Sequence, residues 1–164
     1  MATLPRHFLR PDLEWRPLRE GDLDCVAALE ARIHAAPWTI GNFRDALAAG
    51  YSACVGERES RIVAYGVMLL ARGEAQILNL SVVPDARREG LGHALLQRFV
   101  DDARQFQVEQ IFLEVRASNT AAIRLYEAEG FDPIARRPDY YPGATPDGPH
   151  EDALVMRRSL RQPQ

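Results

Sequence analysis

The sequence has 164 residues, of which 46% are hydrophobic and 26% are charged. At ~150 residues per domain, this length predicts one domain with an ordinary hydrophobic core, and the composition excludes wholesale disorder and fibrous repeats. The formal net charge of −3 argues against a surface devoted to nucleic acid, and no apolar run approaches the ~20 residues that span a bilayer.

The cysteines and histidines predict a protein of a reducing compartment. Cys25 and Cys54 provide neither a disulfide framework nor metal-ligand spacing, and we expect both to be small core residues. The histidines are scattered, so no metal site is expected. Residues 1–12 lack the apolar stretch of a secretory signal. We therefore expect a cytoplasmic protein.

The first half of the chain predicts a strand, two helices and three further strands. Leu13–Pro17 alternates as a strand does, and the residues after Arg19 have the apolar spacing of a helix. Thr39 can cap a second, shorter helix. Short turns between the next β-rich runs predict an antiparallel meander. These runs are Tyr51–Glu57, Arg61–Ala71 and Glu74–Val83.

The second half predicts alternating helices and strands. Apolar residues recur at helical spacing from Leu91 to Phe106, Gln110–Val115 has the composition of a buried strand, and Ser118 or Asn119 can cap a helix that Gly130 ends. The predicted closing strands are Phe131–Ala135 and Ala153–Arg158, joined by a Pro- and Gly-rich loop from Pro138 to Pro149.

These elements together predict an α/β fold with a mixed sheet flanked by helices. A meander followed by a strand-helix-strand unit gives both antiparallel and parallel pairs, with room for a ligand near the carboxyl ends of the strands. We expect a single domain over residues 13–160, after an N-terminal extension of residues 1–12 and before a tail of residues 161–164.

The segment Val82–Ala94 ends a strand and opens a helix, where a phosphate can bind. A helix N-terminus carries unpaired N–H groups and partial positive charge, and Gly90 and Gly92 allow close approach to the backbone. Arg87 and Arg88 add cationic donors suited to a pyrophosphate. The alternative is a solvated arginine pair before an ordinary helix. The glycine spacing fits neither a dinucleotide fingerprint nor a Walker A loop.

Arg87-Arg88-Glu89-Gly90-Leu91-Gly92 resembles the R/Q-x-x-G-x-G/A signature of the GCN5-related N-acetyltransferase (GNAT) family. The resemblance extends from about Leu13 to Arg158 and is strongest toward the RimI branch, the ribosomal-protein alanine N-acetyltransferases. Three further segments carry it, namely Ala36-Pro37-Trp38, Leu113 to Asn119, and Tyr140-Tyr141-Pro142 with Glu151-Asp152-Ala153. It implies a mostly antiparallel sheet that splays at a bulge where acetyl-coenzyme A (acetyl-CoA) binds.

The resemblance also implies which residues hold acetyl-CoA. Backbone groups of Leu80, Ser81 and Val82 would contact the pantetheine and the acetyl carbonyl, with the Val82 N–H as the oxyanion donor. Asn119 would cap its helix and make a polar contact with coenzyme A. The phosphates would bind along the turn, at Arg87, Arg88, Glu89, Gly90, Leu91, Gly92 and His93.

Glu114 is the candidate general base. An acceptor α-amine has a pKa of ~7.7 to 8 and must lose a proton before it attacks. Glu114 lies within an otherwise apolar strand, where a carboxylate is costly without a partner or a purpose. The alternatives are a solvated carboxylate or one paired with Arg116. The resemblance favours catalysis, with water as an intermediary.

Tyr126 is the candidate general acid. A phenol near the sulfur can protonate the departing thiolate of coenzyme A. Tyr126 follows Asn119 by nearly two helical turns, so both can face one cleft beside Glu114. The alternative is a core tyrosine that packs with Phe131. The pattern from Leu125 to Phe131 resembles that around the acid of the family.

Trp38, Tyr140 and Tyr141 are the candidate acceptor-binding residues, because the resembling enzymes bind peptide at these segments. Packing of loops onto the core is an equal alternative for each. The usual acceptor of the branch is the N-terminal alanine of a small-subunit ribosomal protein. Pro138-Asp139 and the N-terminal extension depart from the common pattern, and both can alter which peptide is accepted.

The sequence therefore predicts an enzyme that acetylates a protein N-terminal amine by direct attack on acetyl-CoA. Transfer to lysine or a small amine is an alternative, and a non-catalytic acyl-CoA-binding module is another. We expect a monomer that contacts neither nucleic acid nor membrane, with acetyl-CoA and the ribosomal peptide as its partners.

Overall fold

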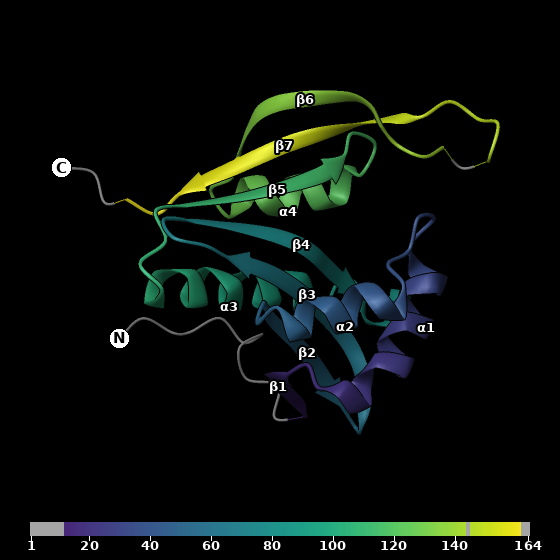
Figure 1. Cartoon of the computed structure of the whole chain (residues 1–164), viewed down its shortest axis with the longest axis vertical. Helices are drawn as coiled ribbons and strands as arrows, with labels where there is room; N and C mark the ends of the chain where they lie inside the picture. Colours follow the sequence, from purple (N-terminus) through teal and green to yellow (C-terminus); the bar gives the residue numbers. More distant parts are fainter. Residues whose placement is uncertain (1–11, 144, 162–164) are drawn as a thin grey trace. The chain divides into compact units, whose positions relative to one another are not determined.

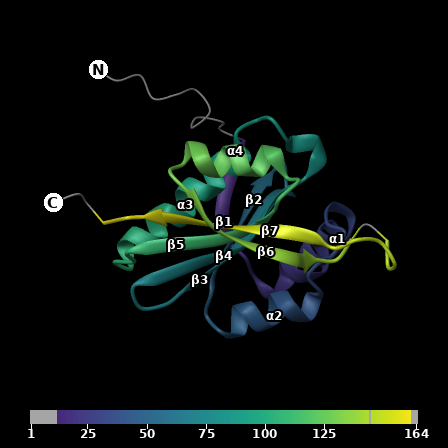
Figure 2. The same cartoon turned by 90° about the horizontal axis from the view of Figure 1, so that it is seen from above.

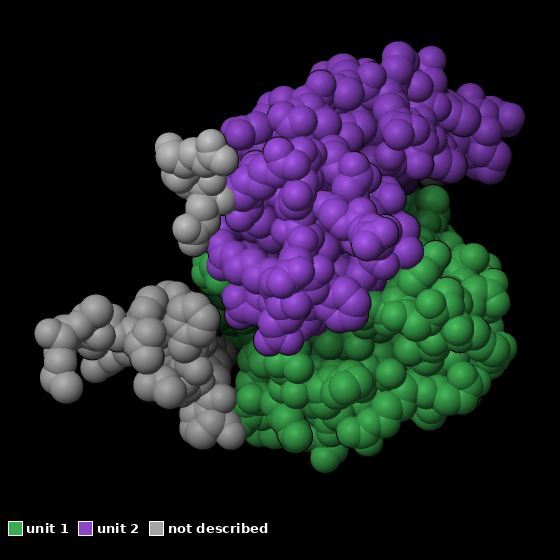
Figure 3. All heavy atoms as spheres, turned by 60° about the vertical axis from the view of Figure 1, so that its left-hand side comes forward, with its two compact units in different colours: residues 1–67, 79–99 green, residues 68–78, 100–164 purple. Residues whose placement is uncertain are grey.

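The computed structural model describes residues 12–143 and 145–161. Apart from Asp12 and Arg161, the predicted extension and tail lie outside these residues. The described residues form two compact units (Figure 3): unit 1 comprises residues 12–67 and 79–99, and unit 2 comprises residues 68–78, 100–143 and 145–161. No helix in the described part of the chain is long and apolar enough to cross a membrane.

Seven strands form one mixed sheet flanked by helices, as predicted (Figure 1 and Figure 2). The hydrogen-bonded order is β1-β2-β3-β4-β5-β7-β6, and β4 and β5 are parallel. The strands are β1 Leu13–Pro17, β2 Ser52–Arg58, β3 Arg61–Leu70, β4 Glu74–Val82, β5 Gln110–Arg116, β6 Asp132–Tyr141 and β7 Glu151–Ser159. The helices are α1 Leu23–Ile33, α2 Ile40–Ala48, α3 Leu91–Gln105 and α4 Thr120–Ala128, with 3-10 turns at Glu20–Asp22 and Pro84–Ala86.

The predicted caps are present on two of the helices. Thr39 accepts a hydrogen bond from the Asn42 N–H at the start of α2, and Asn119 accepts one from the Ala122 N–H at the start of α4. Gly130, with φ of 85°, follows the end of α4 in the left-handed conformation that glycine adopts without strain. These local signals explain why the helix starts agree with the prediction.

Helix α1 buries one stripe of side chains in unit 1. Leu23, Val26 and Glu30 are buried, whereas Cys25 is exposed. The prediction that Cys25 is a core residue was therefore wrong, because its position falls off the buried stripe of the helix. Cys54, on β2, is buried as predicted.

Strand β6 is longer than predicted. The local pattern predicts a strand over Phe131–Ala135 and a loop from Pro138, but β6 continues to Tyr141. β6 is the last strand of the sheet, so one of its edges needs no hydrogen-bond donors, and prolines are tolerated there. The ladder with β7 is irregular between Arg137 and Tyr141.

Arg16 ties β1 to the start of α1 through Asp22. Its two Nη atoms lie 2.7 and 2.8 Å from the Asp22 carboxylate oxygens, and its Nε lies 2.8 Å from Glu57. The hydrogen bonds from Arg16 hold the pKa of Asp22 below its ordinary value. The Asp22 side chain is only 13% exposed, so the pair is partly shielded from solvent.

We predict that Asp22→Asn lowers the free energy of unfolding at pH 7 by about 1.5 to 3 kcal/mol, the value of a charge-assisted hydrogen bond. Because the folded pKa is lowered, this stabilisation is complete above the unfolded pKa of ~3.9 and is lost as the pH falls through the folded value. Urea unfolding at pH 7 and pH 3 measures both effects. Asp24→Asn, on an exposed residue of α1, is the control. An equal loss of unfolding free energy in Asp24→Asn would contradict the stabilising role of the Arg16–Asp22 pair.

Candidate active site

The predicted phosphate turn lies in unit 1 between β4 and α3. Arg88 and Gly90 both have left-handed backbone, with φ of 63° and 82°. Leu91 is 3% exposed and packs with Ala64 and Ala86, so its side chain anchors the turn and only its backbone is available to a ligand. Backbone N–H groups at a helix start in such a turn form a site for an anion.

Two of the predicted phosphate-binding side chains already have partners within unit 1. The Arg87 Nε donates to the Val82 carbonyl at 3.3 Å, and the Glu89 carboxylate lies 2.7 Å from Arg58. Glu89 thus holds the turn against β2 as an ion pair. Arg87 and Arg88 are exposed, while Gly92 and His93 are half-buried in the first turn of α3. The turn therefore presents two guanidinium groups at the start of a helix.

A buried carboxylate, Glu30, organises the strand that leads into this turn. Glu30 is 2% exposed and accepts hydrogen bonds from the Tyr65 hydroxyl at 2.6 Å and from the Asn79 amide at 3.2 Å to each oxygen. The backbone N–H of Trp38 donates to the same carboxylate at 3.2 Å. Burial and the hydrogen bond to Glu30 raise the pKa of Tyr65 well above its usual value, so the phenol remains a donor.

Ser81 and His34 extend this network toward the surface. The Ser81 hydroxyl donates to Asn79 Oδ1 at 2.7 Å, so it must accept the 2.8 Å hydrogen bond from His34 Nε2. His34 therefore carries a proton on Nε2. The side chains of Asn79 and Ser81 are thus fixed on both sides of Leu80. This network was not predicted from the sequence, although a glutamate on the apolar stripe of α1 was its signal.

Trp38 has packing partners and also borders an open hollow. Its ring lies 5.1 Å from that of Phe43, and Phe43 lies 6.0 Å from Tyr65. Trp38 lines a hollow with Tyr51 and residues of α2. Within unit 1, the carboxylate of Glu30 therefore holds the backbone of Trp38, a candidate peptide-binding residue. It also holds Asn79 on β4, the strand whose end is the candidate site for acetyl-CoA.

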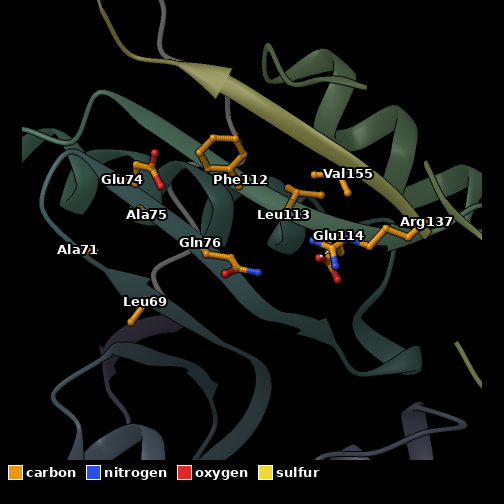
Figure 4. A pocket seen from close by; sticks show the side chains of 10 residues that line it. All are labelled: Leu69, Ala71, Glu74, Ala75, Gln76, Phe112, Leu113, Glu114, Arg137 and Val155. Carbon is orange, nitrogen blue, oxygen red and sulfur yellow. Dashed lines mark ion pairs between the residues drawn. The ribbon is translucent and has the colours of Figure 1, made fainter. Parts of the chain in front are cut away.

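Glu114 lies in unit 2 at a cavity of about 280 Å³. Figure 4 shows its side chain meeting that of Arg137, with Gln76 of β4 nearby. The Arg137 Nε is 3.3 Å from Glu114 Oε1. Arg116, the partner considered from the sequence, pairs instead with Glu151 at 3.3 Å. The cross-strand partner Arg137 was not identified from the sequence.

Tyr140 and Tyr141 both lie within the electrostatic reach of Glu114. The Tyr140 hydroxyl donates a hydrogen bond to Glu114, which raises the pKa of Tyr140. Burial, together with the charges of Glu114 and Tyr140, raises the pKa of Tyr141 to about 12. The guanidinium of Arg116 lies 4.5 Å from the centre of the Tyr141 ring. Unit 2 thus brings both tyrosines to the carboxylate proposed as the base.

Tyr126 is 8% exposed and packs against Phe131, with 6.0 Å between ring centres. Burial, with a smaller contribution from Tyr141, raises the pKa of Tyr126 to about 12. A phenol with this pKa stays protonated across the neutral range, so it is available as a donor. Asn119, by contrast, is exposed at the start of α4 and acts as the helix cap.

Comparison with known proteins identifies the family. A model described as the acetyltransferase (GNAT) family matches residues 13–131. The ribosomal protein bS18-alanine N-acetyltransferase of Escherichia coli is 38% identical over 139 residues, which cover 85% of this chain and 92% of that protein. The chain therefore belongs to the acetyltransferase (GNAT) family, as its turn motif predicted.

Solved structures agree with this assignment. The crystal structure of the ribosomal-protein-S18-alanine N-acetyltransferase from Escherichia coli has a TM-score of 0.84 and 35% identity, covering 93% of this chain and 96% of that one. A putative acetyltransferase from Salmonella typhimurium, solved with its cofactor acetyl-CoA, shares the fold at a TM-score of 0.76 and 21% identity, covering 92% of this chain and 95% of that chain. The chain is an acetyl-CoA-dependent N-acetyltransferase.

We predict that Tyr65→Phe lowers the free energy of unfolding by about 1.5 to 3 kcal/mol, because it removes a hydrogen bond to a buried carboxylate. It should also raise the KM for acetyl-CoA, since that carboxylate holds Asn79, and Asn79 in turn holds Ser81. Urea unfolding and steady-state kinetics measure the two effects. Tyr51→Phe, a half-buried phenol outside the network, is the control. Equal effects of the two variants would show that the hydrogen bonds to Glu30 neither stabilise the fold nor support acetyl-CoA binding.

Proposed function

We propose that this chain acetylates the α-amine of an N-terminal alanine of a small-subunit ribosomal protein. The acceptor assignment is supported by the relatives named as bS18-alanine N-acetyltransferases. Residues 13–160 form one catalytic domain. Acetyl-CoA binds along Leu80–Val82 and at the turn that ends in His93, and the candidate peptide-binding residues are Trp38 in unit 1 and Tyr140 and Tyr141 in unit 2.

The reaction proceeds by direct attack of the amine on the thioester. The amine nitrogen forms a bond to the acetyl carbon, and the carbon–sulfur bond then breaks. Glu114 accepts the proton from nitrogen, directly or through water, and Tyr126 donates a proton to the departing thiolate. The Val82 N–H stabilises the oxyanion. The observation that carries this proposal is the half-buried Glu114 carboxylate, which faces a cavity from a strand whose alternate residues are buried.

The protonated state of Tyr126 suits its proposed role. Its pKa of about 12 keeps the phenol protonated across the neutral range. The phenol therefore holds its proton until negative charge develops on sulfur. Tyr141 interacts electrostatically with both Tyr126 and Glu114, so the proposed acid and base share a neighbour within unit 2.

The acceptor class is tested with peptides that differ only at the first residue, incubated with acetyl-CoA and analysed by mass. We expect one acetyl group on the peptide that begins with alanine. We expect none on the same peptide with a blocked N-terminus and an internal lysine. The enzyme itself contains no lysine, so its own side-chain acetylation cannot confuse the comparison. Transfer to the blocked peptide would contradict the proposal.

Glu114→Gln is expected to lower kcat/KM by about 10²-fold or more, the usual contribution of a general base. The loss should be largest at low pH, where the amine is protonated, while calorimetry shows unchanged binding of acetyl-CoA. Glu74→Gln, at the other carboxylate of the cavity, is the matched control. A wild-type rate and pH profile in Glu114→Gln would exclude Glu114 as the base.

A further inference from the structure

The ion pair at Glu114 joins a fixed carboxylate to a mobile cation. The Glu114 side chain is 16% exposed and is held by β5, whereas the Arg137 side chain is 56% exposed. Exposed ion pairs contribute little to stability, because solvent screens them and the long side chain loses conformational freedom. The guanidinium can therefore leave the carboxylate at small cost.

Arg137 lies at the start of a bulge in β6. From Arg137 to Tyr141, β6 advances four residues while the paired positions on β7 are two residues apart. Asp139, within the bulge, has left-handed backbone with φ of 51°. Asp152 holds the bulge, because it accepts hydrogen bonds from the Asp139 N–H at 3.0 Å and from Arg136 at 2.6 Å. Bulges of this kind redirect side chains beside active sites.

The surroundings of the guanidinium are those that recognise an ammonium group. Its central carbon lies 5.5 Å from the centre of the Tyr140 ring, and its Nε lies against the Glu114 carboxylate. A carboxylate and an aromatic face together bind cations. An acceptor α-amine, with a pKa of ~7.7 to 8, arrives mostly protonated and needs the same partners. Two cations cannot share one carboxylate without repulsion.

We propose that Arg137 determines acceptor selection by occupying the position beside Glu114 that the acceptor ammonium must take. This inference rests on the proposed function of Glu114. An acceptor enters by displacing the guanidinium toward Tyr140 and solvent. A small amine that makes no further contact with the enzyme gains too little binding free energy to displace the guanidinium. A peptide that also contacts the neighbouring tyrosines gains enough to displace it. Arg137 thus acts as a competitor within the chain.

The test compares Arg137→Gln with Arg137→Lys, which keeps a cation. We expect Arg137→Gln to lower the KM for the alanine peptide two- to fivefold and to leave the KM for acetyl-CoA unchanged. The KM for a free small amine should fall by a larger factor. Arg137→Lys should keep the wild-type values. Arg124→Gln, an exposed arginine of α4, provides the same change of charge away from the cavity. A raised or unchanged peptide KM in Arg137→Gln would overturn the proposal.

Calorimetry of the peptide with each variant, in the presence of coenzyme A, separates this inference from the proposed chemistry. Arg137→Gln should tighten peptide binding two- to fivefold even if Glu114 proves not to be the base. In a Glu114→Gln background the same substitution should have no effect, because no carboxylate remains to compete for. An equal gain in both backgrounds would show that Arg137 acts elsewhere and overturn the proposal.

Discussion

The alternation of side chains along β5 is the constraint on which the site in unit 2 depends. Ile111, Leu113 and Val115 are buried, so the strand cannot shift by one residue without exposing all three. Glu114 must therefore point to the opposite face, where the cavity lies. A carboxylate held by a packed strand has a defined position, whereas the arginine that pairs with it does not.

Much of the fold could be predicted from local sequence signals. The apolar spacing of α3 is regular, so the helix could be predicted. The glycines and arginines of the turn before it are typical of a phosphate-binding site. Thr39 and Asn119 cap their helices because their side chains satisfy N–H groups of the first turn. The parallel pairing of β4 and β5 follows from the helix between them. Such features depend on residues close together in the chain.

The features that the sequence did not predict depend on residues far apart in the chain. Pro138 predicts the start of a loop from local sequence, but it lies within β6, and a proline is tolerated there because β6 is at the edge of the sheet. Arg137 reaches Glu114 from β6, which is separated from β5 by β7 in the sheet. The role of Glu30 depends on its hydrogen bonds with Tyr65 and Asn79, which lie on β3 and β4. In each case a neighbour in space decides the role of the residue.

The most direct measurement is a crystal structure with a bisubstrate analogue, in which an alanine peptide is joined through its nitrogen to the acyl group of coenzyme A. The proposed mechanism predicts the nitrogen within ~3 Å of a Glu114 oxygen, or of one water bound to it. It also predicts the pyrophosphate at the N–H groups from Arg88 to His93, and Arg137 displaced from Glu114. A nitrogen that faces away from Glu114, with the carboxylate still paired to Arg137, would contradict the mechanism.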